Sequence, residues 1–387
     1  MRIGVITYWN SSDNYGQQLQ CYALQTVLRS WGHDAFLIRY SPERPRKTIF
    51  QKVINNLLHP KYLLKHIPFE TIIRRDARIE EELKIINDRN NPIRGFEQFR
   101  KDNLKMTETI YRSFPELVSN PPEADAYITG SDQVWYSSFN EEAIKGYFLM
   151  FGSDQIKRLS YAASIGRILD KKEQALLPLY LKHFDAISVR EESARQQCVK
   201  QGVKAQVCID PTMLLDIAFY RKIAKTTNDN RYAFLYVLNV KSAEEFNLPA
   251  IRNYVEEKGF ALKSVTGSGY CQGRELIENS KNLLATIPEW LGYMNDARCV
   301  FTTSFHGTVF SVLMHRPFLT IGLQGTNSHS NARMEQLLSK LGIPERMFDP
   351  QKSIREQMDS PIDWAGVDLR LTELRQSSID YLRENLK

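Results

Sequence analysis

Short apolar runs alternate with amphipathic helical stretches along most of the chain. The first run, IGVITY from residue 3, precedes a polar loop and a stretch over 16–31 whose apolar residues fall near one face, which predicts a helix. Gly32 suits the end of that helix, and AFLIRY predicts the next strand. The order strand, helix, strand is typical of a βαβ unit.

Four further short strands follow, and helical stretches separate them. They are predicted within DAYITGSDQVW (125–135), RLSYAASIG (158–166), DAISVREES (185–193) and AQVCIDPTM (205–213). Strands alternating with helices indicate a mostly parallel α/β sheet.

A second alternation begins near residue 230. It consists of RYAFLYVLNV, a helix over 243–258, ALKSVTGSG, the helix IPEWLGYMNDA, CVFTTS, a helix over 307–315 and PFLTIG. A chain of 387 residues also exceeds what one hydrophobic core usually holds.

We therefore predict an α/β protein with two open α/β domains facing a cleft. The first covers 1–212, with a basic and mostly helical insertion at about 42–120, and the second covers 213–368. A long polar helix over 369–387 is expected to pack back on the first domain.

Composition narrows the class of protein. Hydrophobic residues make up 42% and charged residues 25%, as in ordinary globular proteins, and no apolar run reaches the roughly 20 residues that span a bilayer. The start, MRIGVITYWNSSDNYG, is not typical of a signal peptide, because it has one positive charge and a short apolar run. Five scattered cysteines without a CxxC pair fit a reducing cytoplasm and argue against a structural zinc site.

The net charge of +6 is unevenly spread. Between Arg39 and Arg75 there are nine basic residues against two acidic ones, interleaved with the amphipathic TIFQKVINNLLHPKYLLKHIPF. The pattern favours a solvated helical insertion, and the alternative is a patch over 47–69 that contacts an anionic membrane or an acidic glycan. No nucleic-acid motif accompanies this charge, so we expect no nucleic-acid partner.

Ligands of open parallel sheets bind beyond the carboxyl ends of the strands. The residues predicted there are Asn14, Tyr15, Gly16, Ser131, Asp132, Gln133, Ser164, Gly166, Arg190, Asp210, Ser304 and His306.

His306 stands at the start of a helix, where Ser304 can cap and Gly307 leaves the backbone open to a ligand. A helix N-terminus favours anions and keeps an imidazole neutral, ready to act as a base. A capping histidine without chemistry fits the pattern equally well.

Arg190 follows the strand AISV and could hold a carboxylate or phosphate through two bonds, unless it pairs with Glu191, Glu192 or Asp185. Arg333 could serve as a second anion clamp, although the pattern alone favours a surface helical arginine.

Asp132 and Gln133, after AYIT, could bind substrate hydroxyls or form an Asx turn. For Asp210, before Pro211, the pattern favours a cap and turn, and for His329 an exposed loop.

Several common cofactor-binding and catalytic motifs are absent from the sequence. NSSDNYGQQ has one glycine, which excludes a dinucleotide fingerprint and a P-loop, and neither HExxH nor GxSxG occurs. We therefore expect no metal and no cofactor. What remains suits a small anionic substrate that meets a polyhydroxylated one.

Over about 1–345 the sequence resembles the polysaccharide pyruvyl transferase family. The matching segments are ITYWNSSDNYGQQLQCYALQ, YITGSDQVW, YAASIG, ISVREESA, CIDPTMLL, TTSFHGTVFSVL and SHSNARMEQLLSKLGI. The resemblance implies two Rossmann-like domains in a GT-B-like arrangement and phosphoenolpyruvate as donor. It also implies a pyruvate ketal bridging two hydroxyls of a sugar in a surface polysaccharide or its lipid-linked precursor.

By the same resemblance, Arg190 matches the donor-contacting arginine of the RE/RD motif, and His306 matches the histidine of S-x-H-G near the reacting centre. We assign catalysis to His306 and Asp132. Donor binding is assigned to Arg190, Ser304, Gly307 and Arg333, and acceptor binding to Asn14, Tyr15, Gly16 and Gln133. Two alternatives stay open, a nucleotide-sugar-dependent GT-B glycosyltransferase and a non-catalytic glycan-binding homologue.

Overall fold

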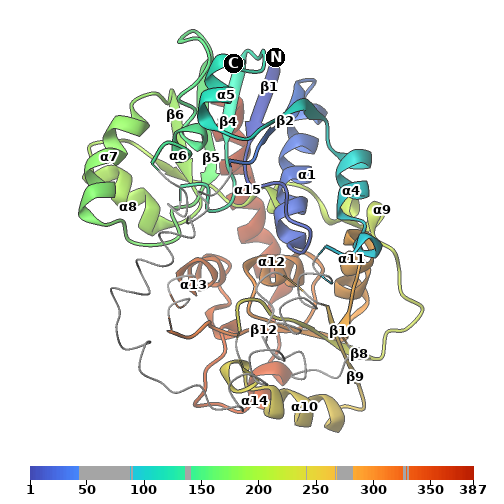
Figure 1. Cartoon of the computed structure of the whole chain (residues 1–387). Helices are drawn as coiled ribbons and strands as arrows, with labels where there is room; N and C mark the ends of the chain where they lie inside the picture. The colour runs from blue at the N-terminus through green and yellow to red at the C-terminus, as the bar shows by residue number, and fades with distance from the viewer. Residues whose placement is uncertain are drawn as a thin grey trace, which may run out of the picture.

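Two parallel β-sheets organise the chain in the computed structural model (Figure 1). The structure describes residues 1–42, 88, 90–135, 141–240, 242–265, 267, 282–325, 328 and 331–387. His329 and the basic segment 47–69, with its predicted membrane contact, lie outside the described residues.

The first sheet has seven strands in the order β3-β2-β1-β4-β5-β6-β7. These are β1 (Arg2–Ile6), β2 (Asp34–Tyr40), β3 (Met106–Tyr111), β4 (Ala126–Thr129), β5 (Lys157–Ala163), β6 (Ala186–Val189) and β7 (Gln206–Val207). The helices in this part are α1 (Tyr15–Ser30), α4 (Phe96–Asn103), α5 (Phe114–Ser119), α6 (Ile144–Tyr147), α7 (Lys171–Leu181) and α8 (Glu192–Lys200). The strand order reverses between β1 and β4, which is the switch point of a Rossmann-like sheet.

The second sheet repeats this arrangement with five strands in the order β10-β9-β8-β11-β12. Its strands are β8 (Tyr232–Tyr236), β9 (Ala261–Val265), β10 (Asn282–Leu283), β11 (Cys299–Thr302) and β12 (Phe318–Thr320). The α-helices from here on are α9 (Ile217–Ile223), α10 (Leu248–Glu257), α11 (Ile287–Asp296), α12 (Phe305–Leu313), α13 (Asn331–Lys340), α14 (Ile354–Asp359) and α15 (Trp364–Asn385). Single 3₁₀ turns are η2 (Pro92–Arg94), η3 (Pro211–Met213), η4 (Glu244–Phe246) and η8 (Pro344–Arg346). The predicted class, α/β with two Rossmann-like units, is confirmed.

The prediction of a mostly helical insertion over 42–120 is wrong at its C-terminal end. β3 is an edge strand of the first sheet and pairs in parallel with β2. Its sequence, MTETIY, buries only Tyr111 fully, so the alternation of apolar and polar residues that marks a half-buried strand is weak.

Local sequence explains where α1 begins and ends. The Asn14 side chain caps the helix by accepting a hydrogen bond from the Gln17 N–H. Gly32 follows the helix with a φ of +86°, a conformation that glycine adopts without steric cost. The chain then enters β2, and this placement aims the N-terminus of α1 at the second domain.

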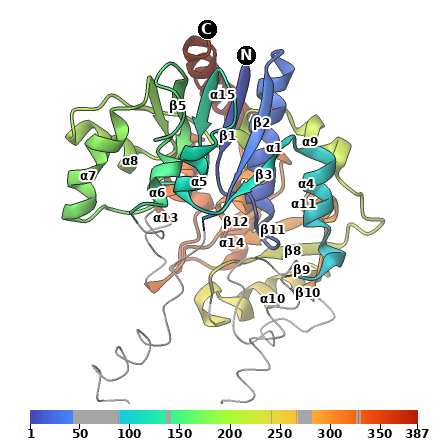
Figure 2. The ribbon, with the colours of Figure 1, turned by 45° about the horizontal axis from the view of Figure 1, so that its top comes forward.

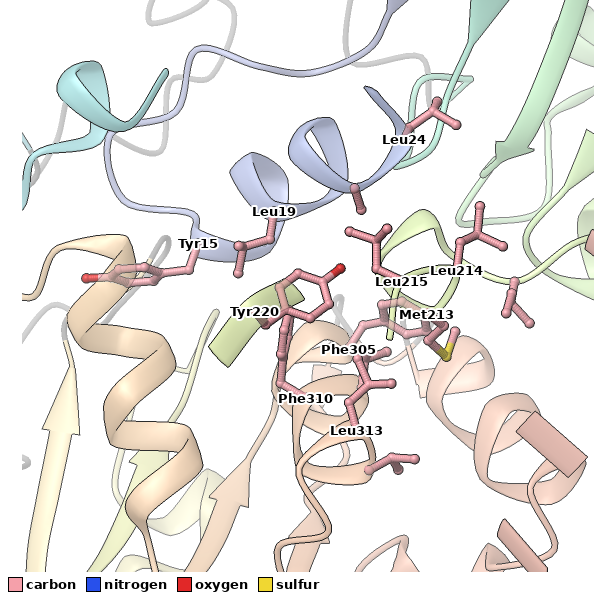
Figure 3. Packing of buried hydrophobic residues seen from close by; sticks show 14 of the residues in the cluster. Tyr15, Leu19, Leu24, Met213, Leu214, Leu215, Tyr220, Phe305, Phe310 and Leu313 are labelled. Atoms are coloured by element: carbon pink, nitrogen blue, oxygen red, sulfur yellow. The ribbon is translucent and has the colours of Figure 1, made fainter. Parts of the chain in front are cut away.

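One hydrophobic cluster joins the two sheets (Figure 3). From α1, Tyr15 stacks on Trp290 of α11 with ring centroids 5.4 Å apart. Tyr220 of α9 meets Phe310 of α12 edge to face at 4.9 Å. Since burial of apolar surface is the main favourable term in folding, this shared core ties the halves of the chain together.

The last helix, α15, returns to the first sheet and ends near the N-terminus of the chain (Figures 1 and 2). Tyr381 donates a hydrogen bond to the Ser160 carbonyl at 2.9 Å, and the Ser378 hydroxyl accepts one from the Ile209 N–H at 3.1 Å. The helix begins at Trp364, earlier than the expected residue 369. In the part of the chain that the structure describes, no helix is long and apolar enough to cross a bilayer.

Candidate active site

The carboxyl ends of the two sheets meet around Asp210, which is fully buried. Its Oδ2 accepts hydrogen bonds from the Ser131 hydroxyl at 2.9 Å and from Nη1 of Arg190 at 3.0 Å. Its Oδ1 accepts from the Thr212 N–H at 3.1 Å and from the Thr212 hydroxyl at 2.7 Å. The segments after β4, β6 and β7 are thereby fixed to one another.

Electrostatics keep this carboxyl ionised. Burial alone would raise the pKa of Asp210, but the neighbouring His306 and Arg190 and the hydrogen bond from Thr212 together hold the pKa well below its usual range. Asp210 is therefore a carboxylate at neutral pH.

His306 lies in the first turn of α12, as predicted, and is nearly buried. Ser304 caps this helix by accepting a hydrogen bond from the Gly307 N–H at 3.3 Å. His306 Nε2 lies 3.7 Å from Oδ1 of Asp210 and, within the described residues, has no hydrogen-bond partner. A buried nitrogen in this state is the kind of group that a substrate satisfies.

Gly16 of α1 closes the other side of the His306 ring. A Cβ built on Gly16 would lie 2.1 Å from Nδ1 of His306, a distance that no side chain tolerates. Glycine at this position thus lets α1 approach the imidazole across the domain junction.

Two arginines from different domains flank the Phe305 ring. The guanidinium carbon of Arg190 lies 4.7 Å from the ring centroid, and that of Arg333 lies 5.8 Å from it. Nε and Nη2 of Arg190 and Nε of Arg333 are buried without a hydrogen-bond partner in the described structure. Burial, and then repulsion from Arg190, lowers the pKa of Arg333 to about 10. Two cations held this way make the junction a candidate anion site.

Asp132 stands beside this pair at the end of β4. Its Oδ1 lies 3.9 Å from Nη2 of Arg190 and accepts the Gln133 N–H at 2.8 Å, while its carbonyl accepts the Ser164 N–H. Gln133 packs against Gly166, where a Cβ would lie 2.3 Å from its Nε2. Asp132 thus lies next to Arg190, but its bond to the following residue is not the Asx turn considered for it, in which the carboxylate accepts the N–H two residues on.

Glu191 is a site residue that the sequence reasoning treated only as a pairing partner of Arg190. Its Oε1 accepts hydrogen bonds from the Ser164 hydroxyl and from the N–H groups of Ile165 and Gly166. Its Oε2 lies 4.0 Å from Nε of Arg190 and lacks a hydrogen-bond partner among the described residues. Its position directly after Arg190 in the sequence indicated a pairing partner and gave no separate signal for a site residue.

Tyr15 and Asn14, both predicted to bind the acceptor, have structural contacts that the sequence did not predict. Tyr15 is fully buried, donates to the Ala285 carbonyl at 2.7 Å and accepts from Arg94 at 3.0 Å, and burial raises its pKa to about 12. Its packing in the junction core leaves no free hydroxyl for an acceptor. Asn14 caps α1.

The sequence predicted that Gly307 leaves its backbone open to a ligand, but in the structure it does not. Its N–H is taken by Ser304, and a Cβ on Gly307 would lie 2.2 Å from the Thr302 hydroxyl. The glycine lets α12 pack closely on β11.

A separate cavity of about 220 Å³ lies beside α6 and α7 in the first domain. Its charged rim is paired, since Lys172 Nζ lies 2.7 Å from Glu141 Oε2 and Arg167 pairs with Glu173. The junction instead brings together charged side-chain atoms of Arg190, Glu191, His306 and Arg333 that lack a hydrogen-bond partner in the described structure, and we take it as the candidate active site. In the ranges listed above, no group of three or more His, Cys, Asp or Glu side chains is placed to hold a metal ion.

Fold and site together define a two-domain α/β protein with a candidate anion site at the junction of two Rossmann-like sheets. The chain belongs to the polysaccharide pyruvyl transferase family, whose model matches residues 14–325. It is thus a member of a transferase family. The comparison with curated proteins gives no match.

Solved structures with similar chain traces include an alpha-glucosyltransferase in complex with UDP and a 13-mer DNA, with a TM-score of 0.49, 10% identity and coverage of 100% of this chain and 93% of that chain. UGT89C1 of Arabidopsis thaliana complexed with UDP-L-rhamnose has a TM-score of 0.48, 10% identity and coverage of 100% and 97%. UDP-N-acetylglucosamine 2-epimerase from Rickettsia bellii has a TM-score of 0.43, 12% identity and coverage of 98% and 97%.

Proposed function

We propose that the protein transfers the pyruvyl group of phosphoenolpyruvate onto two hydroxyls of a saccharide, forming a ketal and releasing phosphate. The acceptor is a sugar of a surface polysaccharide or its lipid-linked precursor. Family membership supports the reaction class. The observation that supports this donor is the set of buried guanidinium nitrogens of Arg190 and Arg333 around Phe305 that have no hydrogen-bond partner among the described residues.

Phosphoenolpyruvate presents a carboxylate and a phosphate, and each needs positive charge and N–H donors. Arg190 and Arg333 supply the charge, and the first turn of α12 adds backbone N–H groups and a partial positive charge. Ser304 shapes this turn as its cap.

At the central carbon of the donor two C–O bonds form, while the π bond to the methylene carbon and the bond to the phosphate oxygen break. The methylene carbon gains a proton, the oxygen of the first hydroxyl bonds to the central carbon, and that hydroxyl loses its proton. The bond to the phosphate oxygen then breaks with its electron pair, and the second hydroxyl oxygen replaces it. The proton of the second hydroxyl leaves with the phosphate.

His306 is assigned the proton transfers of the first half. It gives a proton to the methylene carbon and receives the proton of the first hydroxyl, so it ends in its starting state. A placed general acid and base typically contributes about 10²- to 10⁴-fold. Asp132 and Gln133 are assigned to the acceptor hydroxyls, because they border the two arginines.

Thermal unfolding in the presence of candidate donors tests this proposal. Ligand at a hundred times its Kd stabilises the folded state by ~2.7 kcal/mol. We expect phosphoenolpyruvate to raise the Tm of the unsubstituted protein and of Arg195→Gln, a change on the exposed face of α8, but not that of Arg333→Gln. Arg190→Ala is a poorer probe, because it leaves the buried Asp210 without its cation at a cost of about 3–5 kcal/mol.

Activity separates binding from chemistry. His306→Gln should keep the stabilisation by phosphoenolpyruvate and lose about 10²- to 10⁴-fold in turnover with a saccharide acceptor. Stabilisation by a UDP- or GDP-sugar alone would contradict the proposal and favour the glycosyltransferase alternative.

A further inference from the structure

Every acceptor position of Asp210 is occupied without His306. A carboxylate has about four lone-pair sites. Ser131 and Arg190 occupy those of Oδ2, and the N–H and hydroxyl of Thr212 occupy those of Oδ1. The 3.7 Å separation of His306 Nε2 from Oδ1 agrees with this, because the nitrogen lies within reach of the charge but outside hydrogen-bond distance.

This saturation separates two effects that a carboxylate usually has on a histidine. A buried negative charge at this distance attracts an imidazolium strongly, since water does not screen the pair. A hydrogen bond would in addition hold the Nε2 proton between the two residues. Here the attraction is present and the bond is absent, so the proton stays available to a substrate.

We propose that Asp210 is the positioning residue of this site. Through Nη1 it fixes the Arg190 guanidinium so that Nε and Nη2 remain for a ligand. As a saturated counter-ion it stabilises the imidazolium form of His306 without accepting its proton. That this arrangement supports turnover rests on the proposed function, whereas the electrostatic effect of Asp210 on His306 does not.

Some of the other charges at the junction oppose the protonated form of His306, and others favour it. Arg190 and Arg333 oppose a positive imidazole, as do the N-termini of α1 and α12, which meet at Gly16 and His306. Asp132 after β4 and Glu191 after β6 favour it from beyond Arg190. Among the described residues, Asp210 is the carboxylate that lies within 4 Å of an imidazole nitrogen of His306.

NMR titration of the His306 imidazole in the full-length protein tests the counter-ion role without donor or acceptor. The His306→Gln variant identifies the signal. We expect the titration midpoint to move to lower pH by about one to three units in Asp210→Asn, because the opposite charge is lost. In Thr212→Val the midpoint should move the other way, because Oδ1 loses a donor and can accept from Nε2. Thr212→Ser keeps the hydroxyl and should match the unsubstituted protein.

An unchanged midpoint in Asp210→Asn, or shifts of the same sign in Asp210→Asn and Thr212→Val, would overturn the proposal. If Asp210→Asn does not fold, the contrast between Thr212→Val and Thr212→Ser decides alone. In turnover, loss of the imidazolium as pH rises should begin at lower pH in Asp210→Asn. The expected NMR shifts in a protein that neither binds nor uses phosphoenolpyruvate would refute the proposed function and leave the counter-ion role intact.

Discussion

At the scale of single residues, the contact between Gly16 and His306 restricts the site most. Gly16→Ala places a methyl group 2.1 Å from Nδ1 of His306, so either the imidazole or the start of α1 must shift. A displacement of about 1 Å at a reacting group costs on the order of 10²-fold in rate. We therefore expect Gly16→Ala to lower kcat/KM by at least tenfold.

Gly4→Ala is the matched control for Gly16→Ala. Its added methyl group meets the flexible end of Ile38 at 2.9 Å inside the first sheet, away from the junction. Steady-state kinetics and thermal unfolding of both variants should show loss of stability in each but loss of activity only in Gly16→Ala. Equal kinetics in the two variants would show that the imidazole position is not critical.

Residues at strand ends were predictable, because the carboxyl ends of parallel strands lie at one edge of a sheet. That rule alone brings Arg190, Asp132 and His306 to the junction. The contribution of Phe305 could not be predicted, because an apolar residue in the first turn of a helix has the same sequence pattern as any core residue. Its position between Arg190 and Arg333 depends on how the two domains meet.

At the scale of elements, the N-terminus of α1 has two candidate roles that one substitution series separates. Asn14 caps the helix, and its replacement by alanine should lower the free energy of unfolding by about 0.5–2 kcal/mol. Asn14→Ser restores a capping oxygen and should recover most of that loss in urea unfolding.

The acceptor role assigned to Asn14 leads to a second, kinetic prediction for the same variants. If its amide binds the saccharide, Asn14→Ser should be stable yet raise the KM for the acceptor, while the KM for phosphoenolpyruvate is unchanged. Acceptor kinetics of Asn14→Ser equal to those of the unsubstituted protein would reduce Asn14 to a helix cap.

Elements with a strong periodic signal were predicted well, and those without one were missed. β5 and β8 are buried on both faces, so their apolar runs stand out in the sequence. β3 lies at an edge and five of its six residues are partly or fully exposed, and β10 has only two residues, Asn282–Leu283. Such strands form because a neighbouring strand offers backbone hydrogen bonds, which the local sequence does not record.

At the scale of the whole molecule, the two domains share a core and a returning helix. The cluster around Tyr15 and Trp290 contains side chains of both sheets, and α15 runs from the second domain onto the first. We expect the described part of the chain to unfold in one transition, since neither sheet keeps its buried surface without the other.

Tyr381→Phe tests this coupling at one hydrogen bond. It removes the 2.9 Å bond from α15 to the Ser160 carbonyl, which also accepts from the Ser188 hydroxyl and so keeps a partner. The expected cost is therefore about 0.5–1.5 kcal/mol. In a chain of this length that lowers the Tm by about 1 °C per kcal/mol.

Tyr22→Phe is the control, because in the described structure the Tyr22 hydroxyl makes no such bond across the junction. Calorimetry should show the whole transition moving to lower temperature in Tyr381→Phe, with calorimetric and van't Hoff enthalpies still equal. Separation into two transitions would mean that α15 is held to the first sheet independently of the rest of the second domain, and that the junction does not couple the two halves.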